Sequence, residues 1–480
     1  MNRPVPIVLP AAVAIRPRGR GESAPSTEAQ ARSTARRVAA SLQVGLLAVL
    51  ALTSGCSGAD DHLPPPNVLL VTVDTLRADG LDAPMPRLDA LAAAGTRFTA
   101  AEAPSSWTLP SLGALLTSTY TSTNGLWNRE AALDDSFHTL AEHLGAAGYD
   151  TAAVASHVFL HPRHGLSQGF EHYDTALVKN LMQSHEAISS PKVTRRALGW
   201  LDERAEGEDA DAPFLLWAHY FDPHDVYHEH ADFPGAGEGE RARYRSEVTF
   251  TDHWIGQLVD GLDARGLADD TIVVVVADHG EEFGEHGSTR HGHTLYGELT
   301  RVPLILRVPE RVERDLGLAE RGRDIATPVG VVDVLPTVLE LCDVVPLRRE
   351  GPAVHGVDGK RLDQLHFAGQ SLVPLLANQP YEPRPLLAEL RLREGRFAES
   401  VLADDHKLVR WGDGRQELYD LAADPDEQRD LLAPAAPPFD ADELRRLELL
   451  LEKSVEVAEL VGSLHGDAGR LELTDAARAA

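Results

Sequence analysis

Two runs of apolar, mostly β-branched residues that each stop on a carboxylate constrain this chain more than any other feature. Asn67–Val73 is followed by Asp74, and Thr271–Ala277 is followed by Asp278 and His279. Such runs are typical of central strands in a parallel sheet that is buried on both faces. Open α/β sheets place their binding crevice at the carboxyl ends of these strands. If the two strands lie side by side, Asp74, Asp278 and His279 supply oxygen and nitrogen ligands to one divalent cation.

The rest of the chain alternates predicted strands with predicted helices. This alternation predicts an α/β fold with a doubly wound, mostly parallel sheet. After residue 345, loops rich in Pro and Gly, two short strands and a charged helix predict a smaller α+β subdomain. We therefore expect a catalytic domain at 67–345 and a C-terminal subdomain at 346–480. The predicted strands are 67–73, 151–155, 214–218, 271–277, 302–308, 400–402 and 407–411, and the predicted helices 86–95, 108–118, 137–148, 180–205, 241–266, 331–341 and 441–460.

A third segment, WTLPS at 107–111, offers a hydroxyl at the start of a predicted helix. Thr108 suits the N-cap position, and Pro110 suits the first turn. A helix N-terminus helps to bind an anionic ester oxygen, and a cation on the Thr108 oxygen would make it a stronger nucleophile. The alternative is that Thr108 is only a helix cap. Similarly, acids at strand ends often only cap helices.

The charge of the chain bears on its partners. The formal net charge is −29, so no basic face is available for nucleic acid. An anionic substrate must therefore be drawn by a local metal ion and not by the overall field.

The N-terminus is predicted to be an export signal. Arg36 and Arg37 precede an apolar run at 44–52, which is too short to span a membrane and is followed by small residues and Cys56. The sequence LTSGC at 52–56 resembles a bacterial lipoprotein box, with Thr53 where Leu is usual. We expect residues 1–56 to direct export, 57–66 to form a tether, and the protein to be a periplasmic or cell-surface lipoprotein held by Cys56. The alternative is a disordered tail without export. Cys342 is predicted to lie in the core.

Taken together and in order, the motifs between residues 66 and 432 resemble the sulfatase family of the alkaline phosphatase superfamily. No single motif is specific, but their order is. The segments are VDTLRAD at 73–79, WTLPS at 107–111 with LLT at 115–117, HYFDPH at 219–224, DHGEEFGEHG at 278–287, TLY at 294–296, RVPL at 301–304, GQSL at 369–372 and ELYDLAADPDEQ at 417–428.

The resemblance implies a role for particular positions. Asp74, Thr108, Asp278 and His279 would hold the divalent cation, which could be Ca, Mg, Mn or Zn. Thr108 would be the nucleophile. His224 and one of His291 or His293 would contact the substrate ester and assist the leaving group.

Three departures from the family pattern favour phosphate over sulfate. Sulfatases proper carry Cys or Ser, oxidised to formylglycine, where this chain has Thr108, and Thr cannot become that aldehyde. A sulfated Thr would need attack by water at sulfur, whereas a phosphorylated Thr can be hydrolysed with metal help. Leu112 stands where sulfatases proper carry Arg, and Gly292 at the place of their Lys.

The many histidines raise the hypothesis of a second cation. His219, His224, His228, His291 and His293 flank predicted strand ends, as in two-metal phosphoesterases. His219 could equally be a satisfied core residue. The acidic residues that follow the metal motif, namely Glu281, Glu282 and Glu285, are predicted to form a solvated loop.

We therefore predict an exported, metal-dependent hydrolase that cleaves phosphate or sulfate esters through a covalent Thr108 intermediate. Its substrate would be a small-molecule, glycan or lipid ester, with membrane contact only through the lipid anchor. One alternative is a transferase that passes a phosphoryl group to an envelope glycan or lipid. Another is a non-catalytic glycan-binding surface protein that retains the fold.

Overall fold

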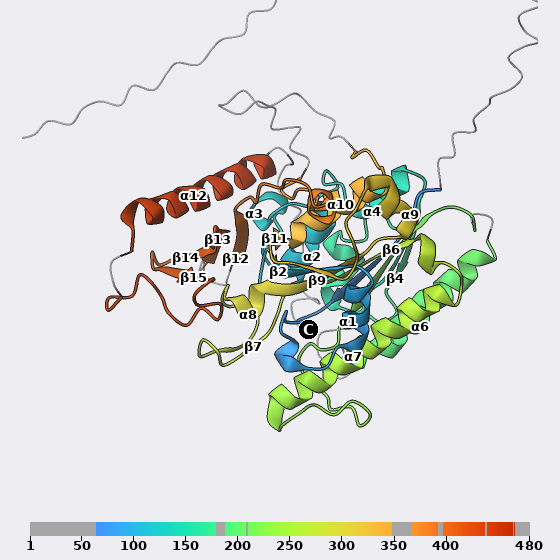
Figure 1. Cartoon of the computed structure of the whole chain (residues 1–480), viewed down its shortest axis with the longest axis horizontal. Helices are drawn as coiled ribbons and strands as arrows, with labels where there is room; N and C mark the ends of the chain where they lie inside the picture. Colours follow the sequence, from blue (N-terminus) through green and yellow to red (C-terminus); the bar gives the residue numbers. More distant parts are fainter. Residues whose placement is uncertain are drawn as a thin grey trace, which may run out of the picture. The chain divides into compact units, whose positions relative to one another are not determined.

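A nine-stranded, mostly parallel sheet forms the centre of the described part of the chain (Figure 1). The computed structural model describes residues 64–178, 188–207, 210–347, 367–391, 397–436, 439–463 and 465. The predicted export signal, Cys56, most of the tether and the beginning of the helix predicted from residue 180 lie outside these ranges. The strands of the large sheet are β1 (Asn67–Val73), β2 (Thr96–Glu102), β3 (Asp150–Val154), β4 (His172–Asp174), β5 (Phe214–Tyr220), β6 (Thr271–Ala277), β9 (Arg301–Arg307), β10 (Arg323–Ile325) and β11 (Val329–Gly330).

The order of the strands is β10-β2-β9-β6-β1-β5-β3-β4, and β11 also pairs with β2. The central strands β6, β1, β5 and β3 run parallel to their neighbours within this group. Every residue of β5 and β6 is buried, which is why these strands are mostly apolar and do not alternate with polar residues. Only β9 runs antiparallel to its neighbours, β2 and β6.

Helices cover both faces of this sheet, as predicted for a doubly wound fold. In Figure 1 α1, α6 and α7 lie on one side of the sheet, and α2, α4 and α10 lie on the other. The bounds are α1 Pro86–Ala93, α2 Thr108–Thr117, α3 Thr121–Asn124, α4 Leu140–Ala146, α6 Ser190–Ala205, α7 Gly239–Asp263, α8 Gly297–Thr300, α9 Glu310–Leu316, α10 Val334–Leu341, α11 Val373–Leu376 and α12 Ala441–Ser463. The short 3₁₀ turns are η1 Gly80–Asp82, η2 Val158–Leu160, η3 Pro162–His164, η4 Ala268–Asp270 and η5 Val331–Asp333.

The C-terminal part contains a second, antiparallel sheet of four strands in the order β12-β13-β14-β15. Apolar residues of this sheet pack with Leu447, Leu451 and Val455 of α12 into a second core cluster. Both sheets belong to one structural unit, Pro64–Ala480. The strands are β12 Leu386–Arg391, β13 Phe397–Ala403, β14 His406–Trp411 and β15 Gln416–Asp420.

Two further findings concern single predictions. Cys342 is buried, as predicted. Among the helices of the described residues, none combines the length and the apolar composition that crossing a membrane requires.

Candidate active site

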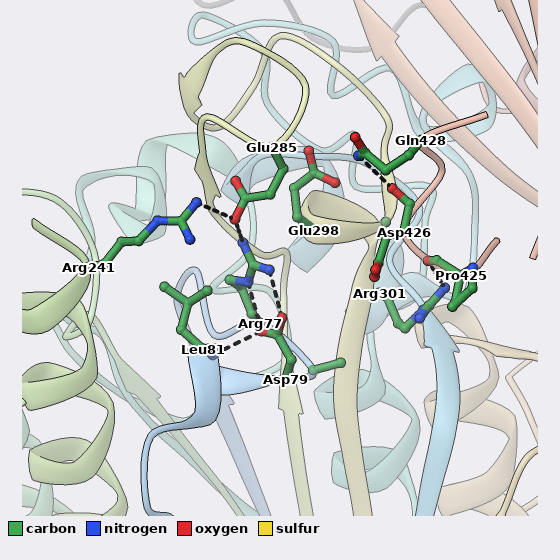
Figure 2. Close-up of a pocket in the computed structure, with 12 residues that line it drawn as sticks. Arg77, Asp79, Leu81, Arg241, Glu285, Glu298, Arg301, Pro425, Asp426 and Gln428 are labelled. Carbon is green, nitrogen blue, oxygen red and sulfur yellow. Dashed lines mark hydrogen bonds and ion pairs between the residues drawn. The ribbon is translucent and has the colours of Figure 1, made fainter. Parts of the chain in front are cut away.

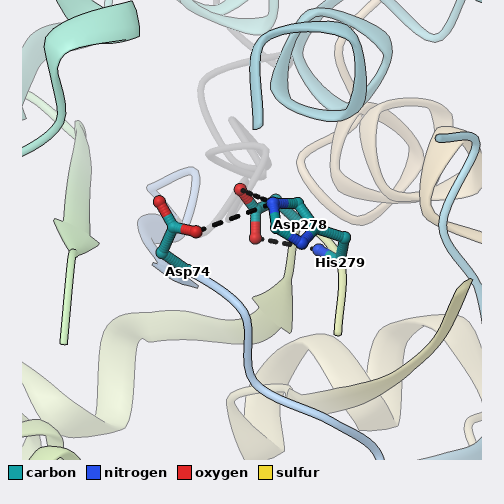
Figure 3. Close-up of side chains that lie close together, drawn as sticks. All are labelled: Asp74, Asp278 and His279. Atoms are coloured by element: carbon teal, nitrogen blue, oxygen red, sulfur yellow. Dashed lines mark hydrogen bonds and ion pairs between the residues drawn. The ribbon is translucent and has the colours of Figure 1, made fainter. Parts of the chain in front are cut away.

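The register of β1 and β6 brings the predicted metal ligands together. Val73 lies opposite Ala277 in a parallel pair, so the next residue of each strand, Asp74 and Asp278, leaves the sheet at the same edge (Figure 3). The Asp74 amide donates to the Tyr220 carbonyl of β5 at 2.9 Å, which fixes the point where the chain turns away. The predicted ligands thus lie at the carboxyl ends of the strands, where open α/β sheets place their binding sites.

Asp74, Asp278 and His279 form a buried cluster whose potential ligand atoms all lie within 4.8 Å of one another. Both carboxylate oxygens of Asp74 and Oδ2 of Asp278 have no hydrogen-bond partner among the described residues. Buried carboxylate oxygens are normally satisfied, because an unpaired one is costly. A divalent cation would satisfy all three atoms, so these residues fit the metal that the sequence predicts.

The tautomer of His279 fits the same role. Its Nδ1 lies 2.9 Å from the carbonyl oxygen of Gly280 and donates to it, which leaves the lone pair on Nε2. This Nε2 atom lies 3.6 Å from Asp74 Oδ1 and 3.7 Å from Asp278 Oδ2. A histidine whose other nitrogen donates to a backbone carbonyl is the usual arrangement of a metal ligand.

Gly280 directly follows the predicted ligand His279. A Cβ atom there would lie 2.0 Å from the carbonyl oxygen of Glu298, so Gly280 is needed for close packing of two backbone segments and not for a left-handed turn.

The electrostatics of the cluster have one dominant cause, which is burial. Burial and the neighbouring charge of Asp278 raise the pKa of Asp74 well above its ordinary value. Burial raises the pKa of Asp278 to about 8 and holds the pKa of His279 well below 6.5. A positive charge bound between these two carboxyl groups would favour their ionised forms and offset the effect of burial.

Thr108 lies at the same cluster. It is the first residue of α2, and Trp107 occupies the N-cap position that we had predicted for Thr108. The extended backbone of Trp107 makes it the residue that precedes the helix. The Thr108 hydroxyl is buried and lies 3.4 Å from His279 Nε2. Thr108 therefore lies beside His279, one of the three predicted ligands.

The predicted substrate histidines occupy two distinct environments. The His291 ring lies 4.6 Å from the His279 ring and 4.9 Å from the His224 ring. Its Nδ1 atom lies 2.8 Å from Oε1 of Glu281. His293 instead places Nε2 2.9 Å from Oε2 of Glu282. Of the two candidates, His291 is the one with ring contacts to both His279 and His224.

The acidic residues after the metal motif are not a solvated loop, and that prediction is wrong. Glu281 and Glu282 are fully buried. Glu281 also accepts from the Tyr227 hydroxyl at 2.8 Å. The alternation of acidic and small residues looked like an exposed turn, but β7 (Glu282–Phe283) and β8 (Thr289–Arg290) form a hairpin that folds both glutamates inward onto histidines.

Two histidines face Asp74 from the other side, and sequence reasoning missed one of them. His219 places Nε2 3.6 Å from Asp74 Oδ2, and His157 places its Nε2 3.9 Å from the same atom. The Nδ1 atom of His157 accepts the amide of Phe159 at 3.0 Å, so its proton is on Nε2, toward Asp74. The position of His157, two residues after the strand predicted at 151–155, was the signal that could have identified it.

The described residues provide no second cluster of three potential metal ligands in support of the second-cation hypothesis. Asp74, Asp278 and His279 form the one cluster of three potential ligands in the described part of the chain. His228, which we had placed at the second cation, donates its backbone amide to Glu247 at 2.8 Å.

A separate polar cavity of about 430 Å³ lies between Arg77 and residues 425–428 (Figure 2). Arg77 lines this cavity and forms ion pairs with Asp79 at 2.7 Å and with Glu285 at 3.0 Å. Arg241 pairs with the same Glu285 oxygen at 3.1 Å. The positive charges of the two arginines are thus balanced by Asp79 and Glu285. Through its ion pairs with both arginines, Glu285 holds the loop that follows the metal motif in place.

Comparison with known proteins agrees with this site. A family model described as Sulfatase matches residues 66–344, which is more than half of the chain. This chain belongs to the sulfatase family. The matched region contains Asp74, Thr108, Asp278 and His279, and the chain is accordingly an ester hydrolase of that family.

The relatives are distant but cover most of the chain. "Uncharacterized sulfatase YidJ" of Escherichia coli (strain K12) is 25% identical over 447 residues, covering 76% of this chain and 83% of that protein. Among solved structures, a protein in complex with its substrate D-glucosamine-2-N,6-O-disulfate gives a TM-score of 0.63 at 20% identity, covering 85% of this chain and 100% of that one. The phosphonate monoester hydrolase of Agrobacterium radiobacter gives 0.61 at 20% identity, covering 82% and 96%. These likenesses show that the fold is that of the sulfatases.

Proposed function

We propose that this sulfatase-family hydrolase cleaves phosphate or sulfate esters with Thr108 as its nucleophile. The observation that carries the proposal is the 3.4 Å separation of Thr108 Oγ1 and His279 Nε2, beside carboxylate oxygens that lack hydrogen-bond partners. Asp74, Asp278 and His279 would hold a divalent cation together with Thr108. Such a cation supplies Lewis-acid polarisation of the ester and lowers the pKa of the Thr108 hydroxyl.

The chain's own residues then account for two steps. The ionised Thr108 oxygen, whose proton has passed to solvent, attacks the phosphorus or sulfur atom. The bond to the leaving oxygen breaks, and that oxygen takes a proton from His224 or from one of His291 and His293. Water then attacks the Thr108 ester, which releases inorganic phosphate or sulfate and restores the hydroxyl.

Phosphate esters fit this site better than sulfate esters. Thr108 cannot form the aldehyde by which sulfatases proper release sulfate, so its ester must be cleaved by water. The two cationic residues of sulfatases proper are also missing. Leu112 is fully buried inside α2, and Gly292 passes close to Trp107 without any side chain.

The proposal is tested with the full chain and its Thr108→Ala variant. The substrates are nitrophenyl phosphate, a nitrophenyl phosphodiester and nitrophenyl sulfate, each with Mg, Ca, Mn or Zn. Phosphoester turnover that disappears in the variant is the expected result. Turnover of the sulfate ester alone would overturn the preference for phosphate, and equal turnover by the variant would overturn the role of Thr108. Transfer of the phosphoryl group to an added sugar or glycerol acceptor, faster than to water, would favour the transferase alternative.

We also propose that the protein is exported and anchored through Cys56. The support is the arrangement of Arg36, Arg37, the apolar run at 44–52 and the small residues before Cys56. Labelling of the expressed chain with a radioactive fatty acid, lost in Cys56→Ser, is the expected result. An unlabelled chain that stays in the cytosol would contradict it.

A further inference from the structure

Two arginines near the active site lack a carboxylate partner in an otherwise acid-rich chain. The chain has 74 acidic residues against 45 basic ones, and nearby arginines such as Arg77 and Arg290 are paired with carboxylates. Arg129 and Arg163 differ, because neither forms an ion pair with a carboxylate among the described residues. Both are exposed to solvent; Arg129 lies over the Phe159 ring and Arg163 donates to the His164 ring. An arginine that is held in place without being neutralised keeps its full capacity to bind an anion.

Arg163 is held by a buried histidine. Its Nε donates to Nε2 of His164 at 3.0 Å, and the Nδ1 of His164 donates to the carbonyl of Ala131 at 2.8 Å. His164 is fully buried, and burial lowers its pKa to about 4, so the ring is a neutral acceptor. The imidazole therefore orients the guanidinium but leaves its charge uncompensated. The nearby carboxylate of Glu130 acts in the opposite direction on the pKa of His164, but burial is the larger cause.

Arg129 is held by an aromatic ring. Its guanidinium carbon lies 6.0 Å from the centre of the Phe159 ring, within the range of a cation–π contact. The same Phe159 ring contacts the His164 ring, with 5.7 Å between centres. Arg129 thus contacts Phe159 directly, and Arg163 is connected to the same ring through His164. The backbone is equally constrained, because Gly165 has a φ of 79° and a Cβ there would lie 2.7 Å from the Leu133 carbonyl oxygen.

This group lies next to the catalytic cluster. The Phe159 ring is 5.5 Å from the ring of Trp107, the residue before Thr108. It is also 5.0 Å from the ring of His157, which faces Asp74. Phe159 therefore lies between this arginine group and two residues of the active site, Trp107 and His157.

We propose that Arg129 and Arg163 form a subsite for a second anionic substituent of the substrate, a sulfate, phosphate or carboxylate group carried beside the ester that is cleaved. Planar guanidinium groups bind such oxyanions through paired hydrogen bonds. The inference deepens the proposed function and rests on it, because the substituent reaches the subsite only on a substrate whose ester lies at Thr108. It also gives the site cationic groups, although positions 112 and 292 supply none.

The test compares two inhibitors of nitrophenyl-ester turnover by the metal-loaded full chain. D-glucosamine-2-N,6-O-disulfate is expected to inhibit more tightly than D-glucosamine 6-O-sulfate. In Arg129→Ala, Arg163→Ala and the double variant, this preference is expected to fall, by about tenfold or more in the double variant. Arg195→Ala, which removes an exposed arginine of α6, is the matched control and should keep the preference. No preference in the unmodified chain, or an unchanged preference in the double variant, would overturn the subsite.

A binding measurement tests the arginine subsite independently of whether Thr108 is the nucleophile. Calorimetric titration of Thr108→Ala with the disulfate needs no turnover. Tighter binding in the presence of Arg129 and Arg163 than in their absence supports the subsite even if Thr108 proves not to be the nucleophile. Equal binding overturns the subsite even if every nitrophenyl ester is hydrolysed.

Discussion

The Nδ1 atom of His291 lies 2.8 Å from Oε1 of Glu281, a carboxylate that is fully excluded from solvent. The second oxygen of Glu281 accepts from the Tyr227 hydroxyl, so the carboxylate cannot rotate away. This pairing fixes the orientation of the His291 ring beside His279 and His224. Glu281 is therefore a positioning residue for His291, whose ring contacts that of the predicted ligand His279.

The pair leads to a prediction about leaving groups. If His291 protonates the leaving oxygen, His291→Ala should slow hydrolysis of a poor leaving group such as phenyl phosphate by about 100-fold or more, and that of nitrophenyl phosphate much less. Glu281→Gln should follow the same pattern at about tenfold. The measurement is kcat/KM over a series of aryl phosphates. Glu247→Gln is the matched control, because Glu247 binds His230 at 2.7 Å outside the cluster. Equal losses on all leaving groups would contradict the role.

Metal removal should affect stability through the buried carboxylates. Without a cation, both carboxylate oxygens of Asp74 and Oδ2 of Asp278 lack a hydrogen-bond partner among the described residues, so a chelator should lower the melting temperature of the full chain. Asp74→Asn removes one of these charges. It should therefore abolish activity, yet narrow the difference in melting temperature between metal-loaded and chelated protein. Melting in the presence and absence of EDTA measures this, and a variant as sensitive to EDTA as the unmodified chain would contradict the assignment.

A buried ion pair links the small sheet to the catalytic region. Lys407 Nζ lies 2.9 Å from Glu427 Oε1, with both side chains at least 98% buried, and Glu427 also accepts the amide of Gly297 at 3.0 Å. Lys407→Met would leave a buried carboxylate unpaired and should lower the free energy of unfolding by about 3–5 kcal/mol. Urea denaturation measures the change. The exposed pair of Arg314 and Glu310 is the control, and Arg314→Met should change stability by less than about 1 kcal/mol.

His286 should make stability depend on pH. Its Nδ1 lies 2.7 Å from Glu298, and its Nε2 lies 2.9 Å from the carbonyl of Glu427. Burial disfavours the charged ring, but these hydrogen bonds outweigh it and raise the pKa from 6.5 to about 9. The imidazolium therefore stabilises the fold fully below pH 6.5, and this contribution is lost as the pH rises through 9.

The expected size of that effect is about 1–2 kcal/mol, since the site is partly solvated. Comparing urea denaturation of the unmodified chain with that of His286→Gln between pH 6 and pH 9.5 isolates it. The two stabilities should converge as the pH rises. Curves that stay parallel would show that His286 does not titrate between the folded and unfolded states.

The central part of the fold and the cation site could be predicted because both depend on local patterns. Asn67–Val73 and Thr271–Ala277 are almost entirely apolar, a composition typical of strands buried on both faces. Strands such as β2, with its Thr-Arg-Phe-Thr start, were missed because alternating polar residues at the sheet's flank carry a weaker signal. β12 and β15 were missed for a similar reason, as each mixes acidic and apolar residues.

The sequence by itself determined which side chains stand at the ends of the central strands, because a buried run that stops on Asp74 or on Asp278 and His279 can stop only at a sheet edge. The tertiary structure alone decided what surrounds them. Glu281 and Glu282 are buried partners of His291 and His293 because the β7–β8 hairpin folds them inward. Arg163 donates to His164 because both lie in a 3₁₀ turn. The hydrophobic periodicity of the sequence does not predict either contact. The physical reason is that the positions of the metal ligands follow from the register of the strands. The residues that surround these ligands depend instead on how the loops fold over the edge of the sheet.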